Sequence, residues 1–158
     1  MYSRKTALIN VVALTHLTKL FLRPMLARKS GHILNVASTA AFQPGPLMAV
    51  YYATKAYVLW FSEAIADELR DTGVTVTALC PGPTATGFAN VAGMSSSRLF
   101  NLIKPMSSAA VARYGVRAMH RGKRVAIPGV ANKLMMQSLR VSPRRLVTTI
   151  ARKLQENR

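Results

Sequence analysis

Three residues, Ser38, Tyr51 and Lys55, combine types and spacing that suit acid–base chemistry on a small molecule. Tyr51 follows Ser38 by thirteen residues, and Lys55 follows Tyr51 by four within an Ala-rich, helix-forming stretch. Positions i and i+4 of a helix lie on one face, so the lysine ammonium is held beside the phenol. A neighbouring positive charge favours the phenolate of a tyrosine, whose unperturbed pKa is about 10. Such a tyrosine can donate or accept a proton at working pH.

The elements that must position these residues alternate between helix and strand. We expect two long helices at residues 6–28 and 49–71 and a third helix at 107–120. Three short buried strands are expected at 32–37, 74–79 and 124–127, and a helical tail at 131–157. This order predicts an α/β fold with a Rossmann-type doubly wound parallel sheet that is incomplete, with about three strands and flanking helices. One domain is expected over residues 1–158, with a substrate loop at 84–106 and a basic helical tail at 131–158 that is interrupted at Ser142 and Pro143.

Parallel strands bring the candidate residues to one edge of this sheet. Ser38 directly follows the first strand, residues 81–84 directly follow the second, and Tyr51 lies early in the helix between them. Ligands of open α/β sheets bind beyond the carboxyl ends of the strands. The topology therefore predicts that these segments converge on one site.

Asn10, Ser38, Tyr51 and Lys55 resemble the Asn-Ser-Tyr-Lys tetrad of the short-chain dehydrogenases/reductases. The text that carries the resemblance reads LINVVAL, GHILNVAST, YYATKAYV and LCPGPTAT, in that order along the chain. It covers residues 7–88 closely and the tail loosely. A Tyr and a Lys four apart are common by chance, whereas four motifs with the right gaps are a specific signal.

The resemblance implies a role for each member of the tetrad. Tyr51 would be the acid/base that protonates a carbonyl oxygen or deprotonates an alcohol. Lys55 would lower the pKa of Tyr51 and hydrogen-bond the nicotinamide ribose. Ser38 would donate a hydrogen bond to the substrate oxygen, which stabilises developing negative charge, and Asn10 would hold a water that links Lys55 to solvent.

The resemblance also implies a nicotinamide cofactor, which supplies the hydride. It would be NAD or NADP, with NADP the favoured of the two. Besides Tyr51 and Lys55, the cofactor-binding residues would come from the segment after the second strand, namely Pro81, Gly82, Thr84 and Thr86. The substrate would be a small hydrophobic carbonyl compound or alcohol, since the 84–106 loop contains Phe88, Met94, Leu99 and Phe100.

The chain departs from the family pattern in its phosphate site. Cofactor binding in this family uses a Gly-rich TGxxxGxG turn, where backbone N–H groups and a helix N-terminus hold the pyrophosphate. No such turn occurs among the nine glycines of the chain. We therefore expect the C-terminal portion of such an enzyme, whose first strand has an unpaired, apolar edge. We also expect weak cofactor binding by these residues alone.

Composition limits the other possibilities. The single cysteine, Cys80, excludes an internal disulfide and a cysteine-rich zinc site, and the three histidines lack metal-ligand spacing, so no metal is expected. We expect Cys80 to be a small buried hydrophobe, and a cytoplasmic location. The sequence predicts no membrane span, because no apolar run approaches about 20 residues.

The net charge of +17 keeps a second kind of function open, a basic module for nucleic acid or an anionic membrane. No nucleic-acid-binding signature accompanies the charge, so no specific nucleic acid is expected. A third reading is a non-catalytic remnant that associates with a full-length homologue. The continuous apolar run at residues 56–61 predicts a helix buried on more than one side. A homo-oligomer through the helices at 6–28 and 49–71 is therefore expected.

Overall fold

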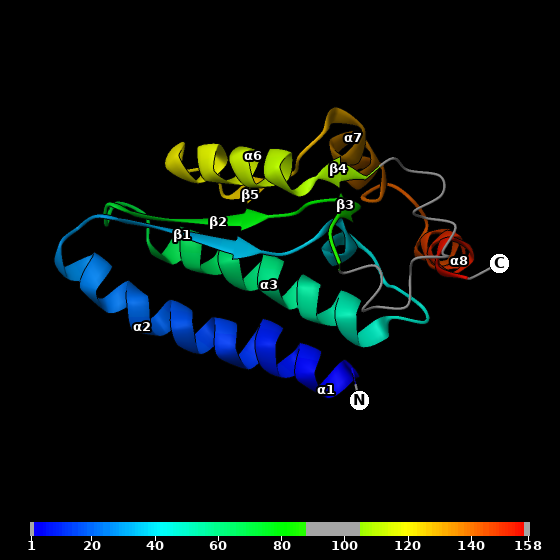
Figure 1. Cartoon of the computed structure of the whole chain (residues 1–158), viewed down its shortest axis with the longest axis horizontal. Coiled ribbons are helices and arrows are strands. Elements are labelled where there is room, and N and C mark those ends of the chain that lie inside the picture. Colours follow the sequence, from blue (N-terminus) through cyan, green and yellow to red (C-terminus); the bar gives the residue numbers. More distant parts are fainter. Residues whose placement is uncertain (1, 88–104, 157–158) are drawn as a thin grey trace.

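A three-stranded parallel sheet lies between two layers of helices (Figure 1). The computed structural model describes residues 2–87 and 105–156. The strands are β1 (Gly31–Val36), β2 (Val74–Leu79) and β5 (Val125–Ala126), in the order β1-β2-β5. Their register runs from the pair Gly31 and Val74 to the pair Val36 and Leu79. The predicted α/β class and the incomplete parallel sheet of three strands are thus confirmed.

The helices around this sheet are α1 (Tyr2–Ala7), η1 (Leu8–Ala13), α2 (Leu14–Ala27), η2 (Thr39–Phe42), α3 (Ala49–Glu68), α6 (Ser108–His120), α7 (Val130–Ser138) and α8 (Arg144–Gln155). The α2 and α3 helices cover one face of the sheet and α6 covers the other (Figure 1). The predicted strand at 124–127 is shorter than expected. The predicted interruption of the helical tail at Ser142 and Pro143 is confirmed, since α7 ends before these residues and α8 begins directly after them. Proline lacks the N–H that an unbroken helix would use there.

The N-terminal helix runs without a break through α1, η1 and α2, and η1 is a π-helical segment. The sequence predicted a plain α-helix over residues 6–28. Asn10 lies inside η1, and short π-helical segments are frequent at functional sites. The widened turn therefore coincides with a candidate site residue.

Three apolar clusters join the layers. The largest lies between the sheet and α3, and it includes Val58, Leu59, Cys80 and Ile127. A second cluster joins β2 to α6 through Leu79 and Val111, and a third joins β2 to the C-terminal end of α3. The expected burial of Cys80 is confirmed, since its side chain is fully enclosed.

A buried polar contact fixes β1 against α3. Asn35 Nδ2 donates to Ser62 Oγ at 3.0 Å, and Ser62 Oγ donates to the Val58 carbonyl at 2.7 Å. Both side chains are buried, where an unpaired polar group would be costly. These contacts give Asn35 a structural role within β1.

The connection from α3 to β2 depends on Gly73. Its φ is +78°, a left-handed conformation that glycine adopts without strain. A Cβ on Gly73 would lie 2.0 Å from the Lys29 carbonyl oxygen, so a side chain would collide with the loop that leads into β1. The two loops at this end of the sheet consequently pack directly against each other.

Two short strands that the sequence did not predict pair beside the carboxyl end of the sheet. The strands β3 (Thr84–Ala85) and β4 (Met106–Ser107) are parallel, and they bracket most of the predicted 84–106 loop. Residues 88–104, with Phe88, Met94, Leu99 and Phe100, lie outside the described residues. Ser107 caps α6, since its side chain accepts a hydrogen bond from Ala110 N at 3.2 Å.

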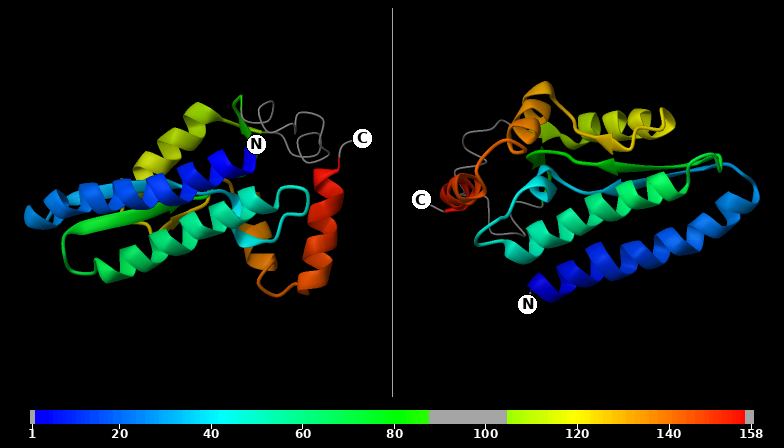
Figure 2. Two further views of the ribbon diagram at one scale, coloured as in Figure 1. Left: turned by 90° about the horizontal axis from the view of Figure 1, so that it is seen from below. Right: turned by 180° about the vertical axis from the view of Figure 1, so that it is seen from behind.

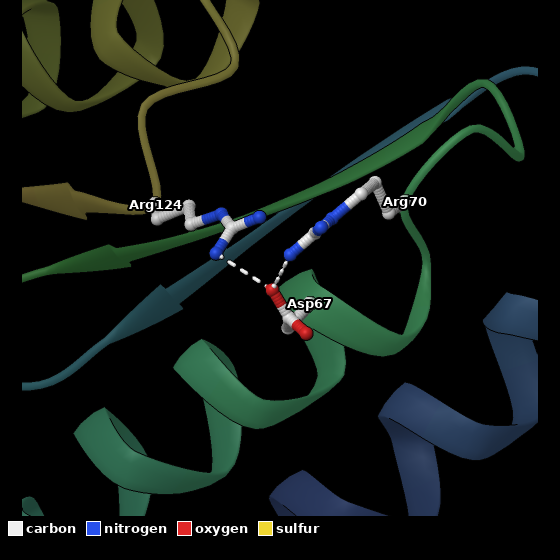
Figure 3. Close-up of polar contacts among 3 residues, drawn as sticks. All are labelled: Asp67, Arg70 and Arg124. Atoms are coloured by element: carbon white, nitrogen blue, oxygen red, sulfur yellow. Dashed lines mark hydrogen bonds and ion pairs between the residues drawn. The ribbon is translucent and has the colours of Figure 1, made fainter.

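One charged cluster links the far end of α3 to the start of β5 (Figure 3). Asp67 accepts a hydrogen bond from Arg70 and a second from Arg124 at 2.9 Å. Hydrogen bonds from Arg70 and then Arg124 hold the pKa of Asp67 below its usual range. All three side chains are exposed, and ion pairs in that setting contribute little to stability.

The N-terminal helix exposes much of its apolar surface. Arg4–Ala27 has a length and composition that would allow it to cross a membrane, and 6% of its most apolar window is buried. Length and composition alone are weak evidence, because signal sequences and core helices of soluble proteins meet the same criteria. The predicted two-sided burial of the second long helix is incomplete in the single chain, since Trp60 is 68% exposed.

Candidate active site

Tyr51 and Lys55 lie in the first two turns of α3, beside the carboxyl end of β1. Lys55 Nζ is 6.0 Å from the centroid of the Tyr51 ring, and it donates to the Val36 carbonyl at 2.8 Å. Val36 is the last residue of β1, so Lys55 is held at the edge where ligands of open α/β sheets bind. Burial lowers the pKa of the Lys55 ammonium from its ordinary value of 10.5.

Ser38 lies two residues beyond the end of β1 and begins η2. Its Oγ accepts from Ala40 N at 3.1 Å, which caps the short helix. The same hydroxyl lies 3.5 Å from the Pro81 carbonyl, at the outer limit for a hydrogen bond. Thr39 N also donates to that carbonyl, at 2.9 Å. The loops after β1 and β2 are therefore joined, as the parallel topology predicts.

Asn10 connects the π-helical segment to the first turn of α3. Its Nδ2 donates to Thr54 Oγ1 at 3.0 Å, and Thr54 Oγ1 donates to the Tyr51 carbonyl at 2.9 Å. Thr54 is buried, and sequence reasoning did not identify it. Its position one residue before Lys55 is the signal that could have found it. The structure thus links Asn10 to the backbone of Tyr51 through one side chain.

The segment after β2, predicted to contact a cofactor, is shaped by close packing. Thr84 Oγ1 donates to the Gly82 carbonyl at 2.9 Å, which closes a tight turn. A Cβ on Gly82 would lie 2.8 Å from Asn132 Nδ2, so α7 packs directly on this glycine. Asn132 is in turn oriented by the Pro128 carbonyl at 2.8 Å. Thr86, two residues after Thr84, is exposed.

Tyr52 differs from its neighbour Tyr51 in being buried and hydrogen-bonded to the tail. Gln155 Nε2 donates to the Tyr52 hydroxyl, and burial raises the pKa of Tyr52 above 10.0. A Cβ on Gly45 would lie 2.2 Å from the Tyr52 ring, so the loop before α3 covers that ring. These contacts indicate that Tyr52 is a packing residue.

The remaining groups near the site offer no second nucleophile or metal centre. Burial raises the pKa of the Cys80 thiol to about 12, so the thiol stays protonated. Among residues 2–87 and 105–156, no three His, Cys, Asp or Glu side chains are grouped as metal ligands would be. The described chemistry is therefore that of a phenol, an ammonium, a hydroxyl and a carboxamide.

Comparison with known proteins identifies the family. A sequence model described as short chain dehydrogenase matches residues 3–95, more than half of the chain. The chain belongs to the short chain dehydrogenase family. Over 77 residues it is 40% identical to 17-beta-hydroxysteroid dehydrogenase type 3 of Mus musculus. The aligned stretch covers 49% of this chain and 25% of that protein. Over 88 residues it is 35% identical to very-long-chain 3-oxoacyl-CoA reductase of Bos taurus. That aligned stretch covers 56% of this chain and 28% of the reductase.

Solved short chain dehydrogenases share the fold. The short-chain dehydrogenase from Sphingobium yanoikuyae, in complex with NADPH, is 27% identical with a TM-score of 0.70. The similarity covers 87% of this chain and 56% of that one. A short chain dehydrogenase from Burkholderia cenocepacia, in complex with NADP, has a TM-score of 0.74 at 22% identity, over 91% of this chain and 56% of that one. The chain thus matches a quarter to just over half of the length of these relatives.

Proposed function

We propose that this chain carries the acid–base half of an NAD(P)-dependent oxidoreductase that interconverts a carbonyl compound and a secondary alcohol. The observation that carries the proposal is the position of Lys55, with Nζ 6.0 Å from the Tyr51 ring and 2.8 Å from the last carbonyl of β1. Tyr51 is the proposed catalytic acid in reduction and the base in oxidation. The family membership supports the same chemistry.

Lys55 stabilises negative charge on the Tyr51 oxygen through its own positive charge. Its partial burial strengthens this effect, because charges interact more strongly where water is excluded. The lowered pKa of Lys55 also makes its ammonium a readier proton donor. Lys55 is therefore the proposed source of the proton that replaces the one Tyr51 gives to a substrate oxygen.

Ser38 is the proposed hydrogen-bond donor to that substrate oxygen. In the part of the chain that the structure describes, its hydroxyl proton has the distant Pro81 carbonyl as an acceptor, at 3.5 Å. A carbonyl oxygen that gains negative charge is a better acceptor, so the proton turns toward it in the transition state. The cap from Ala40 N keeps the Ser38 oxygen in place as the proton turns.

Asn10 is proposed to connect Lys55 with solvent. Its Nδ2 is used by Thr54, whereas a carboxamide also offers an acceptor oxygen that can hold a water. The Asn10–Thr54–Tyr51 connection also fixes the first turn of α3 relative to η1. Asn10 thus has a positioning role in addition to the proposed water relay.

The side chains present fit the nicotinamide half of a dinucleotide. Lys55 and Tyr51 would bond the ribose, and Pro81, Gly82, Thr84 and Thr86 would border the nicotinamide ring. Gly82 has an α7 side chain against it, which holds the 81–84 turn in shape. The cofactor would supply the hydride, and NADP is favoured. The substrate would be small and hydrophobic.

The assembly and location follow from the exposed apolar helices and the cysteine content. We propose a homo-oligomer formed through α1, η1, α2 and α3, which expose large apolar side chains of Leu8, Ile9, Val12, Leu20, Phe21 and Val50. A cytoplasmic location is proposed because one buried cysteine needs no oxidising compartment.

The test is hydride transfer measured by the absorbance of NADPH and NADH at millimolar cofactor, with a set of hydrophobic ketones and alcohols. Tyr51→Phe is expected to abolish turnover while circular dichroism remains unchanged. Tyr52→Phe, one residue away, is the matched control and is expected to retain turnover. Equal rates for the wild-type chain and Tyr51→Phe would refute the assignment of Tyr51.

A non-catalytic role is the second candidate, and the sheet favours it. The described β1 strand pairs with β2 on one edge only, so its other edge is open to a strand from another chain. Under this proposal the chain associates with a full-length relative. Co-purification with such a relative, combined with no turnover across the whole substrate set, would support it.

A further inference from the structure

A cavity lies beside α3, on the face of that helix that carries Ala56, Trp60 and Glu63. Its volume is about 890 Å³, within the range of small-molecule sites. It is bounded by the loop after η2, by α3, by β5 and by the α7–α8 pair. None of Asn10, Ser38, Tyr51 and Lys55 lines it. The cavity thus adjoins the proposed active site at Tyr52, whose ring contacts Tyr51, but it uses a different set of lining residues.

The floor of this cavity is apolar and buried, and its length follows α3. Leu59, Met136 and Val147 line it and are at most 8% exposed. Lining residues extend along α3 from Ala49 to Glu63, a rise of about 21 Å. Such a long, apolar surface fits an extended hydrocarbon chain better than a compact polar molecule.

The rim of the cavity is cationic. Lys133, Arg140 and Arg144 line it and are exposed, against one acid, Glu63. Neither arginine takes part in any of the three ion pairs formed by the described residues, which use Asp67 and Glu156 as acids. The cations therefore remain available to an anion that enters from solvent.

We propose that this cavity binds an amphipathic anion of the fatty-acid type, with its hydrocarbon chain along α3 and its carboxylate at Arg140 and Arg144. A second copy of this chain fits the rim less well. Each copy carries a net charge of +17, and the meeting of two such rims brings like charges together. The proposal is independent of the activity assigned to Tyr51.

Trp60 makes the proposal measurable, because it is the only tryptophan of the chain and it lines the cavity. Oleate, kept below its micellar range, is expected to shift the Trp60 emission to the blue with saturation. A brominated stearate is expected to quench that emission with the same dissociation constant. Dodecylammonium, which has a similar chain and the opposite charge, is expected to bind at least about tenfold more weakly.

Two variants with one matched control test the site itself. Arg140→Gln/Arg144→Gln is expected to raise the dissociation constant of oleate about tenfold, which corresponds to about 1.4 kcal/mol. Ala56→Phe places a ring in the cavity and is expected to abolish saturation. The control, Arg113→Gln/Arg117→Gln, removes the same charge from exposed positions of α6, on the other face of the sheet (Figure 1). It is expected to bind oleate with the wild-type affinity.

Three results would overturn the proposal. The first is the failure of either comparison: oleate and dodecylammonium bind equally, or both cavity variants bind oleate with the wild-type affinity. The second is an emission shift caused by phosphatidylglycerol vesicles but not by free oleate, which would make a lipid surface the occupant. The third is a shift that follows protein concentration alone and is unaffected by oleate, which would make a second copy the occupant. Circular dichroism of each variant confirms that it is folded.

Discussion

Gln155, in the last turn of α8, donates a hydrogen bond to the hydroxyl of Tyr52, the residue that directly follows Tyr51 in α3. The two partners are 103 positions apart, and each is 7% exposed. The Tyr52 ring also meets the Tyr51 ring edge to face, with 5.9 Å between centroids. The C-terminal helix is thereby fastened next to the proposed catalytic tyrosine (Figure 2).

Removal of the Tyr52 hydroxyl should destabilise the fold. Tyr52→Phe leaves the buried Gln155 amide without this acceptor, which costs about 1–3 kcal/mol in the free energy of unfolding. Urea denaturation followed by circular dichroism measures the loss. The double variant Tyr52→Phe/Gln155→Met replaces both polar partners and should recover most of it. A decrease in the free energy of unfolding of less than about 0.5 kcal/mol would show that this hydrogen bond does not stabilise the fold.

Lys55 should make stability depend on pH in the alkaline range. Burial lowers its pKa in the folded state from 10.5, so the unfolded chain binds more protons between the two values. Stability contributed at this site therefore rises with pH through that window. The Lys55→Met variant has no amine to titrate at this position. The difference in unfolding free energy, wild type minus variant, should therefore increase as the pH approaches 10.5. Parallel curves from neutral pH to that limit would contradict the prediction.

Cys80 should resist alkylation in the folded chain. Its thiol is fully buried, and burial raises its pKa to about 12, so thiolate is scarce at pH 8. Iodoacetamide labelling detected by mass spectrometry should be slow in buffer and fast in urea. A Thr149→Cys variant adds an exposed thiol on α8 as an internal standard. Equal rates at the two positions in buffer would show that Cys80 is accessible.

A charge on the outer face of α2 should dissociate the proposed oligomer. Leu20 is 57% exposed in the single chain, and Leu20→Glu places a carboxylate where a second copy would pack. Analytical ultracentrifugation should show a dimer for the wild type and a monomer for the variant. Val116→Glu, at a 44% exposed position of α6 on the other side of the sheet, is the matched control and should remain dimeric. An unchanged sedimentation coefficient for Leu20→Glu would exclude this face as the interface.

The 158-residue chain should bind NADPH weakly. The proposed nicotinamide contacts are present, whereas the sequence contains no TGxxxGxG turn to hold the pyrophosphate. Isothermal titration should therefore show a dissociation constant above the micromolar range. Micromolar binding by these residues would mean that the pyrophosphate is held in another way.

The sequence by itself identified the family motifs and the strands that carry them. Residues 74–79 are β-branched and alternating, and the structure has a strand with those bounds. The tetrad was visible because its members lie in four motifs whose order and gaps resemble the family pattern. The parallel topology then brought the loops after β1 and β2 together, because parallel strands end at one edge.

Only the tertiary structure decided the features that depend on contacts between distant parts of the chain. The Gln155–Tyr52 bond, the β3–β4 pairing and the cavity beside α3 join segments whose separation has no periodic signal. The π-helical turn at Asn10 was likewise not predicted, because the apolar pattern of Leu8–Ala13 indicates a helix and does not distinguish a π-helical turn from an α-helical one. Local pattern determined which residues could do chemistry, and packing decided what surrounds them.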